Sequence, residues 1–271
     1  MNLNTIVEVK RPTSADQVSE WRDGYAWLAG GTWLFSEPQV ATDTLIDLES
    51  LGWPALTPSA DGLEIAATCK IADLHDFKGA PQWRSVPLFG KCIDAFLMSF
   101  KIWNAATIGG NIVMSLPAGA MISLTAALEG VLTLWPRNGT PHQVAVVDFV
   151  TGNHTNVLQP GELLRSIHLP ASALSKRFAM RQVSLTHLGR SAALIVGTVG
   201  DKGEDFLLTI SAATPRPVHL RFEKTPSATE MRRAIDERLP PDAWFHDVHG
   251  SAPYKRHVTL YLAEQIRAEL A

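Results

Sequence analysis

Two glycine pairs constrain this sequence most. The first lies in Ala29-Gly30-Gly31-Thr32, directly after a short apolar run, and the second lies in Thr107-Ile108-Gly109-Gly110-Asn111. Consecutive glycines permit positive φ angles and let a ligand approach the main chain where a β-carbon would block it. Successive main-chain N–H groups in such a turn form a concavity that binds anions. We therefore expect two turns that face each other and hold one phosphate of a pyrophosphate each.

Neither glycine pair matches a standard nucleotide motif. Taken alone, each pair is more often only a tight turn. Neither fits the dinucleotide fingerprint G-x-G-x-x-G, and no lysine follows the glycines as it does in a P-loop. These mismatches argue against a Rossmann or kinase-like site. The residues by themselves indicate a phosphate-binding α+β protein.

Apolar periodicity divides the chain into two parts. In the first part strands alternate with helices, whereas in the second part strands come first and helices follow. The predicted strands cover 25–29, 44–48, 63–67, 131–135, 144–149, 162–169, 177–185, 192–199, 206–213 and 217–222. The predicted helices cover 14–21, 68–77, 89–100, 121–128, 228–239 and 253–270, the last with Ser251 as its cap. This pattern predicts an α+β fold in two pieces, with a boundary near 170–176.

Composition excludes several classes of function. The 24 Lys and Arg against 27 Asp and Glu leave a formal net charge of −3, which argues against non-specific nucleic-acid binding. The two cysteines, Cys69 and Cys92, are too few for a zinc ribbon or an iron–sulfur cluster. If this protein takes part in redox chemistry, we therefore expect its metal centres to lie on another chain.

The sequence shows no targeting or membrane segment. No run of 18 apolar residues is present, and Met1 to Arg11 lacks the apolar region of a signal peptide. Two cysteines without an evident disulfide pattern suit a reducing compartment. We therefore expect a cytoplasmic protein with no membrane span.

Other candidate sites are weak. His246, His249 and His257 lie close together in the sequence, but their spacing matches no H-E-x-x-H helix and no cysteine is near, so capping and surface roles are favoured. No G-x-S-x-G elbow is present, which argues against a serine hydrolase. We predict no catalytic and no metal-binding residue.

Five stretches resemble, in the expected order, the flavoprotein (medium) subunits of the molybdenum hydroxylase family, the carbon monoxide dehydrogenase and xanthine dehydrogenase type. They are Leu28 to Thr32, Asn104 to Asn111, Asp148 to Gly152, Leu158 to Leu164 and Ser251 to His257. The resemblance implies an FAD-binding fold of the p-cresol methylhydroxylase type, with two α+β lobes and a C-terminal domain made of a small antiparallel sheet and helices. It also implies an FAD-binding domain over 1–172 and a C-terminal CO-dehydrogenase-flavoprotein-like domain over 173–271.

The same resemblance implies where FAD is held. The first loop would line the pyrophosphate and ribityl region through its main-chain N–H groups, and the second would grip the other side. Leu158 would pack near the ring system, and Arg181 would place a cation near the flavin. The implied FAD-binding residues are Leu28, Ala29, Gly30, Gly31, Thr32, Trp33, Leu34, Ala106, Thr107, Ile108, Gly109, Gly110, Asn111, Leu158 and Arg181. His154 as a covalent flavin anchor is discounted, since relatives in this group hold flavin without a covalent bond.

Three positions depart from the family pattern. No Asp follows Pro117-Ala118, Trp33 follows Thr32 where an acidic residue is common, and Trp103 stands where an Arg is common. A missing carboxylate removes a charge-assisted hydrogen-bond acceptor, which contributes about 1.5–3 kcal/mol. We therefore expect an FAD affinity unlike that of relatives. Trp103 is expected to stack, to pack at a partner interface or to lie in the core.

The function implied by the resemblance is electron transfer inside a larger enzyme. FAD on this chain would receive electrons from [2Fe–2S] clusters on a small partner, after a large molybdopterin partner oxidises the substrate, and would hand them to an external acceptor. The complex would be a heterotrimer or a dimer of heterotrimers. Two alternatives stay open: a self-sufficient flavin oxidase or dehydrogenase, and a non-catalytic assembly subunit that has lost FAD.

Overall fold

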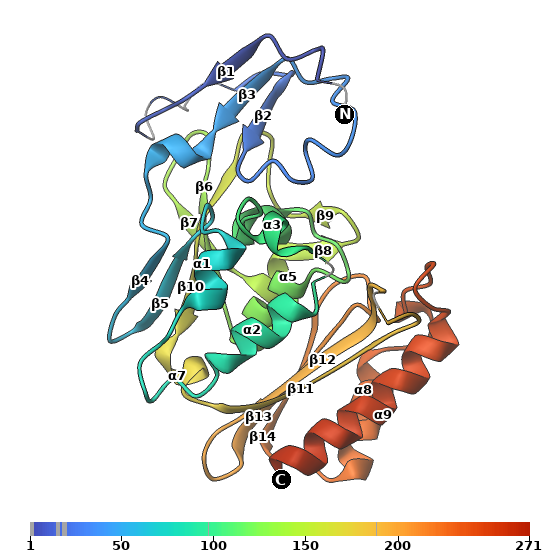
Figure 1. Cartoon of the computed structure of the whole chain (residues 1–271). Helices are drawn as coiled ribbons and strands as arrows, with labels where there is room; N and C mark the ends of the chain where they lie inside the picture. Colours follow the sequence, from blue (N-terminus) through green and yellow to red (C-terminus); the bar gives the residue numbers. More distant parts are fainter. Residues whose placement is uncertain (1–2, 15–16, 18–20, 97, 188) are drawn as a thin grey trace.

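The computed structural model describes residues 3–14, 17, 21–96, 98–187 and 189–271 (Figure 1). The described strands form four sheets, and helices cover two of them. The fold is mixed α+β, as the sequence predicts. The helix expected over 14–21 falls mostly on positions outside the described residues.

The N-terminal lobe carries a small parallel sheet of order β1-β3-β2. The strands are β1 (Glu8–Lys10), β2 (Tyr25–Leu28) and β3 (Thr44–Asp47). The middle strand β3 is the most buried of the three, because it has a neighbour on each side. The first diglycine loop begins where β2 ends, so this sheet fixes its position.

The central lobe is built on a five-stranded antiparallel sheet of order β4-β5-β10-β6-β7. Its strands are β4 (Leu56–Pro58), β5 (Gly62–Ala66), β10 (Leu163–Pro170), β6 (Val131–Trp135) and β7 (His142–Ala145). The helices of this lobe are α1 (Ile71–Asp76), α2 (Pro87–Asp94), α3 (Phe100–Trp103), α4 (Ile108–Val113), α5 (Ala120–Ala127), α6 (Val146–Phe149) and α7 (Ala171–Leu174). A small hairpin, β8 (Val150–Gly152) and β9 (Thr155–Asn156), completes it. Helix α5 is buried at every residue and forms the centre of the core.

The C-terminal part is a four-stranded antiparallel sheet with two helices on one face (Figure 1). Its elements are β11 (Arg177–Ser184), β12 (Ser191–Val199), β13 (Glu204–Ser211), β14 (Val218–Lys224), α8 (Ala228–Arg238) and α9 (Ala252–Leu270). Strand β12 is buried on both faces: Leu194 and Val196 join the central core, while Ala193 and Ile195 pack in a second core with the two helices. The sheet is thus packed between the central lobe and α8–α9.

Most predicted elements are confirmed. The strand expected over 131–135 coincides with β6, and all four late strands form. Ser251 caps α9, since its hydroxyl accepts a hydrogen bond from the Tyr254 amide at 3.4 Å. The Gly200–Gly203 turn joins β12 to β13.

Two predicted elements are wrong in part. The helix expected over 89–100 ends at Asp94, and Phe100 is 67% exposed in the separate turn α3. The apolar residues of this segment do not all pack on one side: Phe89 and Ile93 face the core, whereas Phe96 lines a cavity. The strand expected over 144–149 becomes helical after Ala145. Val146 and Phe149, three positions apart, are both buried by one helical turn.

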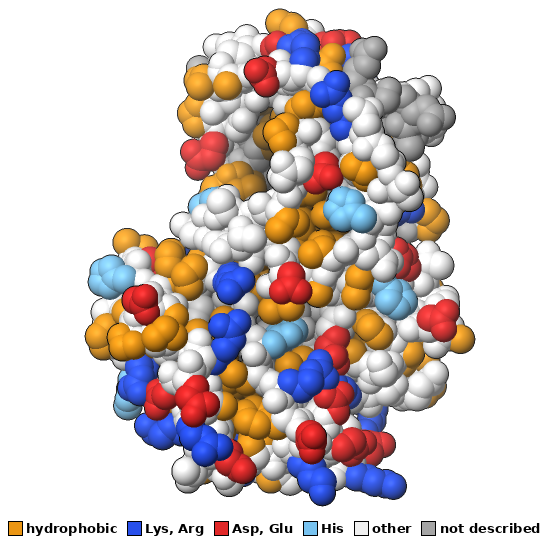
Figure 2. All heavy atoms as spheres, turned by 180° about the vertical axis from the view of Figure 1, so that it is seen from behind, with side chains coloured by type: hydrophobic (Ala, Val, Ile, Leu, Met, Phe, Trp, Pro, Cys, Tyr) orange, Lys and Arg blue, Asp and Glu red, His pale blue; other side chains and the backbone are white. Residues whose placement is uncertain are grey.

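Charged side chains are distributed over the surface. On the face shown in Figure 2, basic and acidic side chains are interspersed and do not gather in one basic patch. Within the described residues, no helix has the length and the apolar character needed to cross a membrane.

A four-membered ion-pair network joins the central lobe to the C-terminal sheet. Lys176, whose side chain is only 7% exposed, lies 2.8 Å from Glu129 Oε1 and 2.6 Å from Asp205 Oδ2. Arg221 pairs with the same two carboxylates. Glu129 follows α5 in the central lobe, whereas Asp205 and Arg221 lie on β13 and β14. The network therefore connects elements from both parts of the chain.

Acidification is expected to destabilise the fold in two steps. Burial lowers the pKa of His219, so its neutral form is favoured in the folded chain and stability falls once the pH drops below about 6.5. Burial raises the pKa of Glu129 and Asp205, but hydrogen bonds from Lys176 and Arg221 outweigh it and leave each pKa below its ordinary value. Their contribution is present at neutral pH and is lost below about pH 4. Urea unfolding at pH 7, 5.5 and 3.5 measures both steps, and equal stability at all three values would contradict them.

Neither cysteine is expected to react in the folded chain. Burial raises the pKa of Cys69 to about 12 and raises the pKa of Cys92 further, so both remain neutral thiols near pH 8. An aromatic disulfide reagent should therefore titrate no thiol in the native chain and two in denaturant. A thiol that reacts within minutes in the native chain would show that the core around it opens.

Candidate functional site

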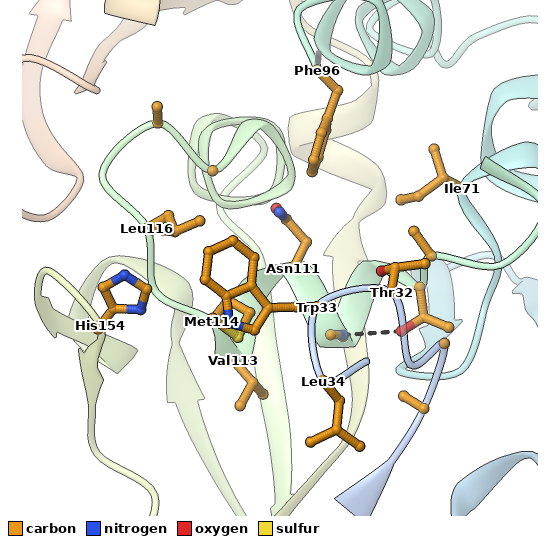
Figure 3. A pocket seen from close by; sticks show the side chains of 18 of the residues that line it. Thr32, Trp33, Leu34, Ile71, Phe96, Asn111, Val113, Met114, Leu116 and His154 are labelled. Atoms are coloured by element: carbon orange, nitrogen blue, oxygen red, sulfur yellow. Dashed lines mark hydrogen bonds between the residues drawn. The ribbon is translucent and has the colours of Figure 1, made fainter. Parts of the chain in front are cut away.

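A cavity of about 750 Å³ lies where the three parts of the molecule meet. Its walls come from the loop 29–34, from the segment 106–119 and from the loop 245–249. The volume lies in the range usual for cofactor sites, about 300–1,000 Å³. Most of the side chains labelled in Figure 3 are apolar, with Thr32, Asn111 and His154 as the polar ones.

The first diglycine loop presents unpaired main-chain amides at this cavity. Gly31 has a φ of +68°, and the Phe35 amide donates to the Gly31 carbonyl at 2.8 Å, which closes one helical turn. Among the described residues, no acceptor takes a hydrogen bond from the amides of 30–34, and these five residues all line the cavity. Free amides at the start of a helical turn form an anion site. The prediction of bare amides is confirmed for this loop.

Gly30 brings the first loop into direct contact with the second segment. A Cβ atom added at Gly30 would lie 2.1 Å from the Ala105 carbonyl oxygen and 3.0 Å from Ala106 Cα. At Gly31 the added atom would lie 2.5 Å from the Phe35 ring. The two loops therefore meet as expected, and only glycine permits that approach.

The second diglycine segment is not a turn of bare amides, so that prediction is wrong. Gly109 and Gly110 lie in the first turn of α4, and neither has a positive φ. The Gly109 amide donates to the Ala67 carbonyl at 3.0 Å, and the Gly110 amide donates to Thr107 Oγ1 at 3.1 Å. A Cβ atom at Gly109 would lie 2.5 Å from Ala67 Cβ. Glycine is required there for close packing of α4 against the segment after β5.

Side chains, rather than amides, face the cavity from α4. Asn111 accepts a hydrogen bond from the Met121 amide at Oδ1 (3.1 Å), and its Nδ2 group has no acceptor among the described residues. The Thr107 hydroxyl caps α4 as an acceptor, so its own hydrogen is available to donate. In the view of Figure 3, the Asn111 side chain appears between Trp33 and Thr32 among the residues that line the cavity. The α4 side thus offers neutral hydrogen-bond donors.

Two aromatic side chains, Trp33 and His154, line the cavity next to each other. The ring centroids of Trp33 and His154 lie 5.9 Å apart with an interplanar angle of 47°. His154, at the tip of the β8–β9 hairpin, has a φ of +55°, and its amide donates to the Ser115 carbonyl at 2.9 Å. The indole lies among Met114, Leu116 and His154 in Figure 3. This wall presents flat aromatic surface on which a planar ring can stack.

The structure brings most of the predicted site residues together. Those that line the cavity are Ala29, Gly30, Gly31, Thr32, Trp33, Leu34, Ala106, Thr107, Gly109, Gly110, Asn111 and Leu158. Leu28 belongs to strand β2 and Ile108 is fully buried in the core, so neither forms part of the described wall.

Arg181 is not brought to the cavity, which contradicts its predicted position. Its guanidinium pairs with Glu269 on α9. Along β11, Phe178 and Met180 pack against the central core, whereas Ala179 lies in the core with α8 and α9. Because side chains alternate along a strand, Arg181 shares the face of Ala179 and points away from the cavity.

A third wall escapes sequence prediction. It comprises Arg190, Ser191, Phe245, Asp247 and His249, all from the C-terminal part. In the sequence, His249 stands out only because His246 and His257 are near it. The contacts that bring it to the cavity are long-range, so local sequence could not predict its position. In the described part of the chain, no group of three or more His, Cys, Asp or Glu is arranged to hold a metal ion.

Trp103 packs inward. Its ring lies 5.0 Å from the His75 ring at 31°, and it contacts the central core. Its Nε1 atom is buried and has no acceptor among the described residues. Trp103 therefore both stacks on His75 and packs against the core, which are two of the three roles expected for it.

Comparison with known proteins shows the family. A family profile for the FAD binding domain in molybdopterin dehydrogenase matches residues 5–172. The chain belongs to this family. Its cofactor is FAD.

Individual relatives are distant. The chain is similar to aldehyde oxidase 2 of Cavia porcellus, with 28% identity over 125 residues; the match takes in 43% of this chain and spans only 9% of that protein's length. Quinoline 2-oxidoreductase from Pseudomonas putida 86 shares the fold with a TM-score of 0.81 at 16% identity, over 100% of this chain and 98% of the other. Carbon monoxide dehydrogenase from Hydrogenophaga pseudoflava gives a TM-score of 0.79 at 19% identity, over 96% of each chain. At such identities the structural matches establish the fold alone.

The residues of the cavity fit FAD. A diphosphate needs amide or cationic donors, and the free amides of 30–34 supply them. Because Gly30 has no β-carbon, this loop can pack directly against the backbone of Ala105. Trp33 and Phe96 provide apolar ring surface in the same cavity (Figure 3).

Proposed function

We propose that the chain is the FAD-carrying electron-transfer subunit of a molybdopterin-dependent dehydrogenase or hydroxylase. Its partners are a small [2Fe–2S] subunit and a large molybdopterin subunit, in a heterotrimer or a dimer of heterotrimers. The names of similar proteins support a molybdenum enzyme: they include a quinoline 2-oxidoreductase and a carbon monoxide dehydrogenase that lacks the Mo-pyranopterin moiety of its molybdenum cofactor. Both cysteines are buried free thiols, so neither is placed to ligate a cluster; free thiols also suit the cytoplasm.

We propose that the free amides of 30–34 bind the pyrophosphate of FAD, and this row of amides is the observation that carries the assignment. The facing wall is formed by Ala106, Thr107, Gly109, Gly110 and Asn111, with Leu158 as an apolar contact. The proposed division of the chain assigns 1–172 to the FAD-binding domain and 173–271 to a C-terminal domain that closes the cavity.

The role of this protein is to position and enclose its cofactor. Bound FAD supplies the exchange of electrons between partners. Asn111 and Thr107, whose oxygens accept from backbone amides, would donate hydrogen bonds to the cofactor from their remaining N–H and O–H groups, and the Trp33–His154 pair would cover it with apolar ring surface. No side chain of the cavity is required as an acid or base toward the substrate, because the substrate reacts on the molybdopterin subunit.

Affinity purification of the tagged chain from its own host tests this function. We expect yellow protein with flavin absorption bands, together with partners that contain iron, acid-labile sulfide and molybdopterin. Flavin-loaded chain that oxidises an alcohol without partners would favour the self-sufficient oxidase instead. Chain with partners but no flavin would identify an assembly subunit.

A further inference from the structure

A fully buried lysine supports the third wall of the cavity. Lys255, near the start of α9, has no exposed side-chain surface. Its Nζ lies 2.9 Å from Asp247 Oδ1, donates to the Ala212 carbonyl at 3.1 Å and stands 5.1 Å from the centroid of the Phe245 ring. A buried ammonium is tolerated only when it is paired in this way. The lysine is therefore part of a built arrangement rather than a surface contact.

The contacts of Lys255 lead to the cavity from two directions. Phe245 and Asp247 line the cavity themselves. The amide of His249, another lining residue, donates to Asp247 Oδ1 at 2.8 Å. On the other side, the Ala212 amide donates to the carbonyl of Pro117 at 2.8 Å, and Pro117 belongs to the central wall. Lys255 thus holds the loop 245–249 in a fixed position beside the segment 117–119.

Asp247 keeps one oxygen free in this arrangement. Oδ1 accepts from both Lys255 and the His249 amide, whereas no described residue donates to Oδ2. The side chain remains 22% exposed at the cavity wall. A carboxylate oxygen with unused lone pairs accepts strong hydrogen bonds from hydroxyl or N–H donors. The nearby segment 117–120 contributes no carboxylate of its own.

We propose that Asp247 binds a neutral hydrogen-bond donor of FAD, a hydroxyl or the imide N–H, through Oδ2, and that Lys255 is the positioning residue that orients this carboxylate. The proposal rests on FAD occupying the cavity. It assigns a polar contact to the C-terminal part of the chain, and it replaces the carboxylate that is missing after Pro117-Ala118.

Three variants of the full chain separate this contact from general stability. Asp247→Asn should raise the dissociation constant for FAD about tenfold, the size of one lost charged hydrogen bond. Lys255→Met should lower the melting temperature, because it leaves a half-buried carboxylate unpaired. In the double variant Lys255→Met/Asp247→Asn no buried charge is left alone, so the melting temperature should return toward that of the unmodified chain. The dissociation constant should nevertheless stay about tenfold raised.

The matched control is the exposed ion pair between Arg256, which follows Lys255 on α9, and Asp236 on α8. Arg256 Nη2 lies 2.6 Å from Asp236 Oδ1. Arg256→Met/Asp236→Asn should change neither quantity. Flavin fluorescence quenching gives the FAD affinity, and thermal unfolding of the FAD-free chain gives the stability. Recovery of both quantities in the double variant, or normal FAD affinity in Asp247→Asn, would overturn the proposal. Absence of FAD binding by the unmodified chain would instead overturn the cofactor site itself, and this contact with it.

Discussion

Replacing Gly30 by alanine is expected to weaken FAD binding about a hundredfold, equivalent to about 2.7 kcal/mol. The added methyl carbon would lie 2.1 Å from the Ala105 carbonyl oxygen, which is backbone and cannot rotate away. The first loop must therefore move off the second segment, and its amides move with it. Overpacking of this kind also lowers the free energy of unfolding by about 1–3 kcal/mol. Titration of the FAD-free chain with FAD measures the first effect and urea unfolding the second.

Gly90→Ala is the control for this substitution. Gly90 lies in α2, where an added Cβ atom meets no other atom within 4 Å. Because alanine favours a helix over glycine, this variant should be neutral or up to about 1 kcal/mol more stable, with unchanged FAD affinity. Normal FAD affinity in Gly30→Ala would mean that the contact between the loops does not shape the cofactor site.

Replacing Lys176 by methionine is expected to cost about 1–3 kcal/mol of folding stability, because it takes a buried ammonium away from two partly exposed carboxylates. The ammonium lies between Glu129 and Asp205, and only 7% of its side chain is exposed. Without it, two carboxylates remain close together, and Arg221 must compensate both. Since the network joins the central lobe to the C-terminal sheet, the unfolding transition should also broaden.

The control for Lys176 is an exposed pair of the same kind. Arg233 and Glu237 lie 3.8 Å apart on α8, with 69% and 71% of their side chains exposed. Arg233→Met should change the free energy of unfolding by less than about 0.5 kcal/mol. Urea unfolding at pH 7 measures the free energy of unfolding of both variants. An equally small decrease in the two variants would show that the network contributes little to stability.

Local sequence pattern was enough for elements with strong periodicity and clear caps. Strand β6 and the cap of α9 at Ser251 were predictable because their signals lie within a few residues. The second diglycine pair shows the limit of such signals. A Gly-Gly pair is equally suited to a positive φ and to close packing, and here packing against Ala67 decides. That neighbour is distant in sequence, so local pattern could not identify it.

The misplaced cation and the missed third wall have the same physical origin. Whether Arg181 faces the cavity depends on which side of β11 packs on the central core, and this is fixed by Phe178 and Met180 only in the folded molecule. Asp247 lies in a loop without a local motif, and its position is set by the buried Lys255. A buried lysine is rare, so the sequence alone suggests a surface charge at that position.

Amide hydrogen exchange, followed by NMR on the full chain with and without FAD, tests the cofactor site most directly. We expect the amides of 30–34 to exchange rapidly in the free chain, because they have no described acceptor, and to become protected when FAD binds. The Gly109 amide, which donates to Ala67, should be protected in both states. FAD binding that leaves the amides of 30–34 exchanging as before would contradict the assignment of this loop to the pyrophosphate.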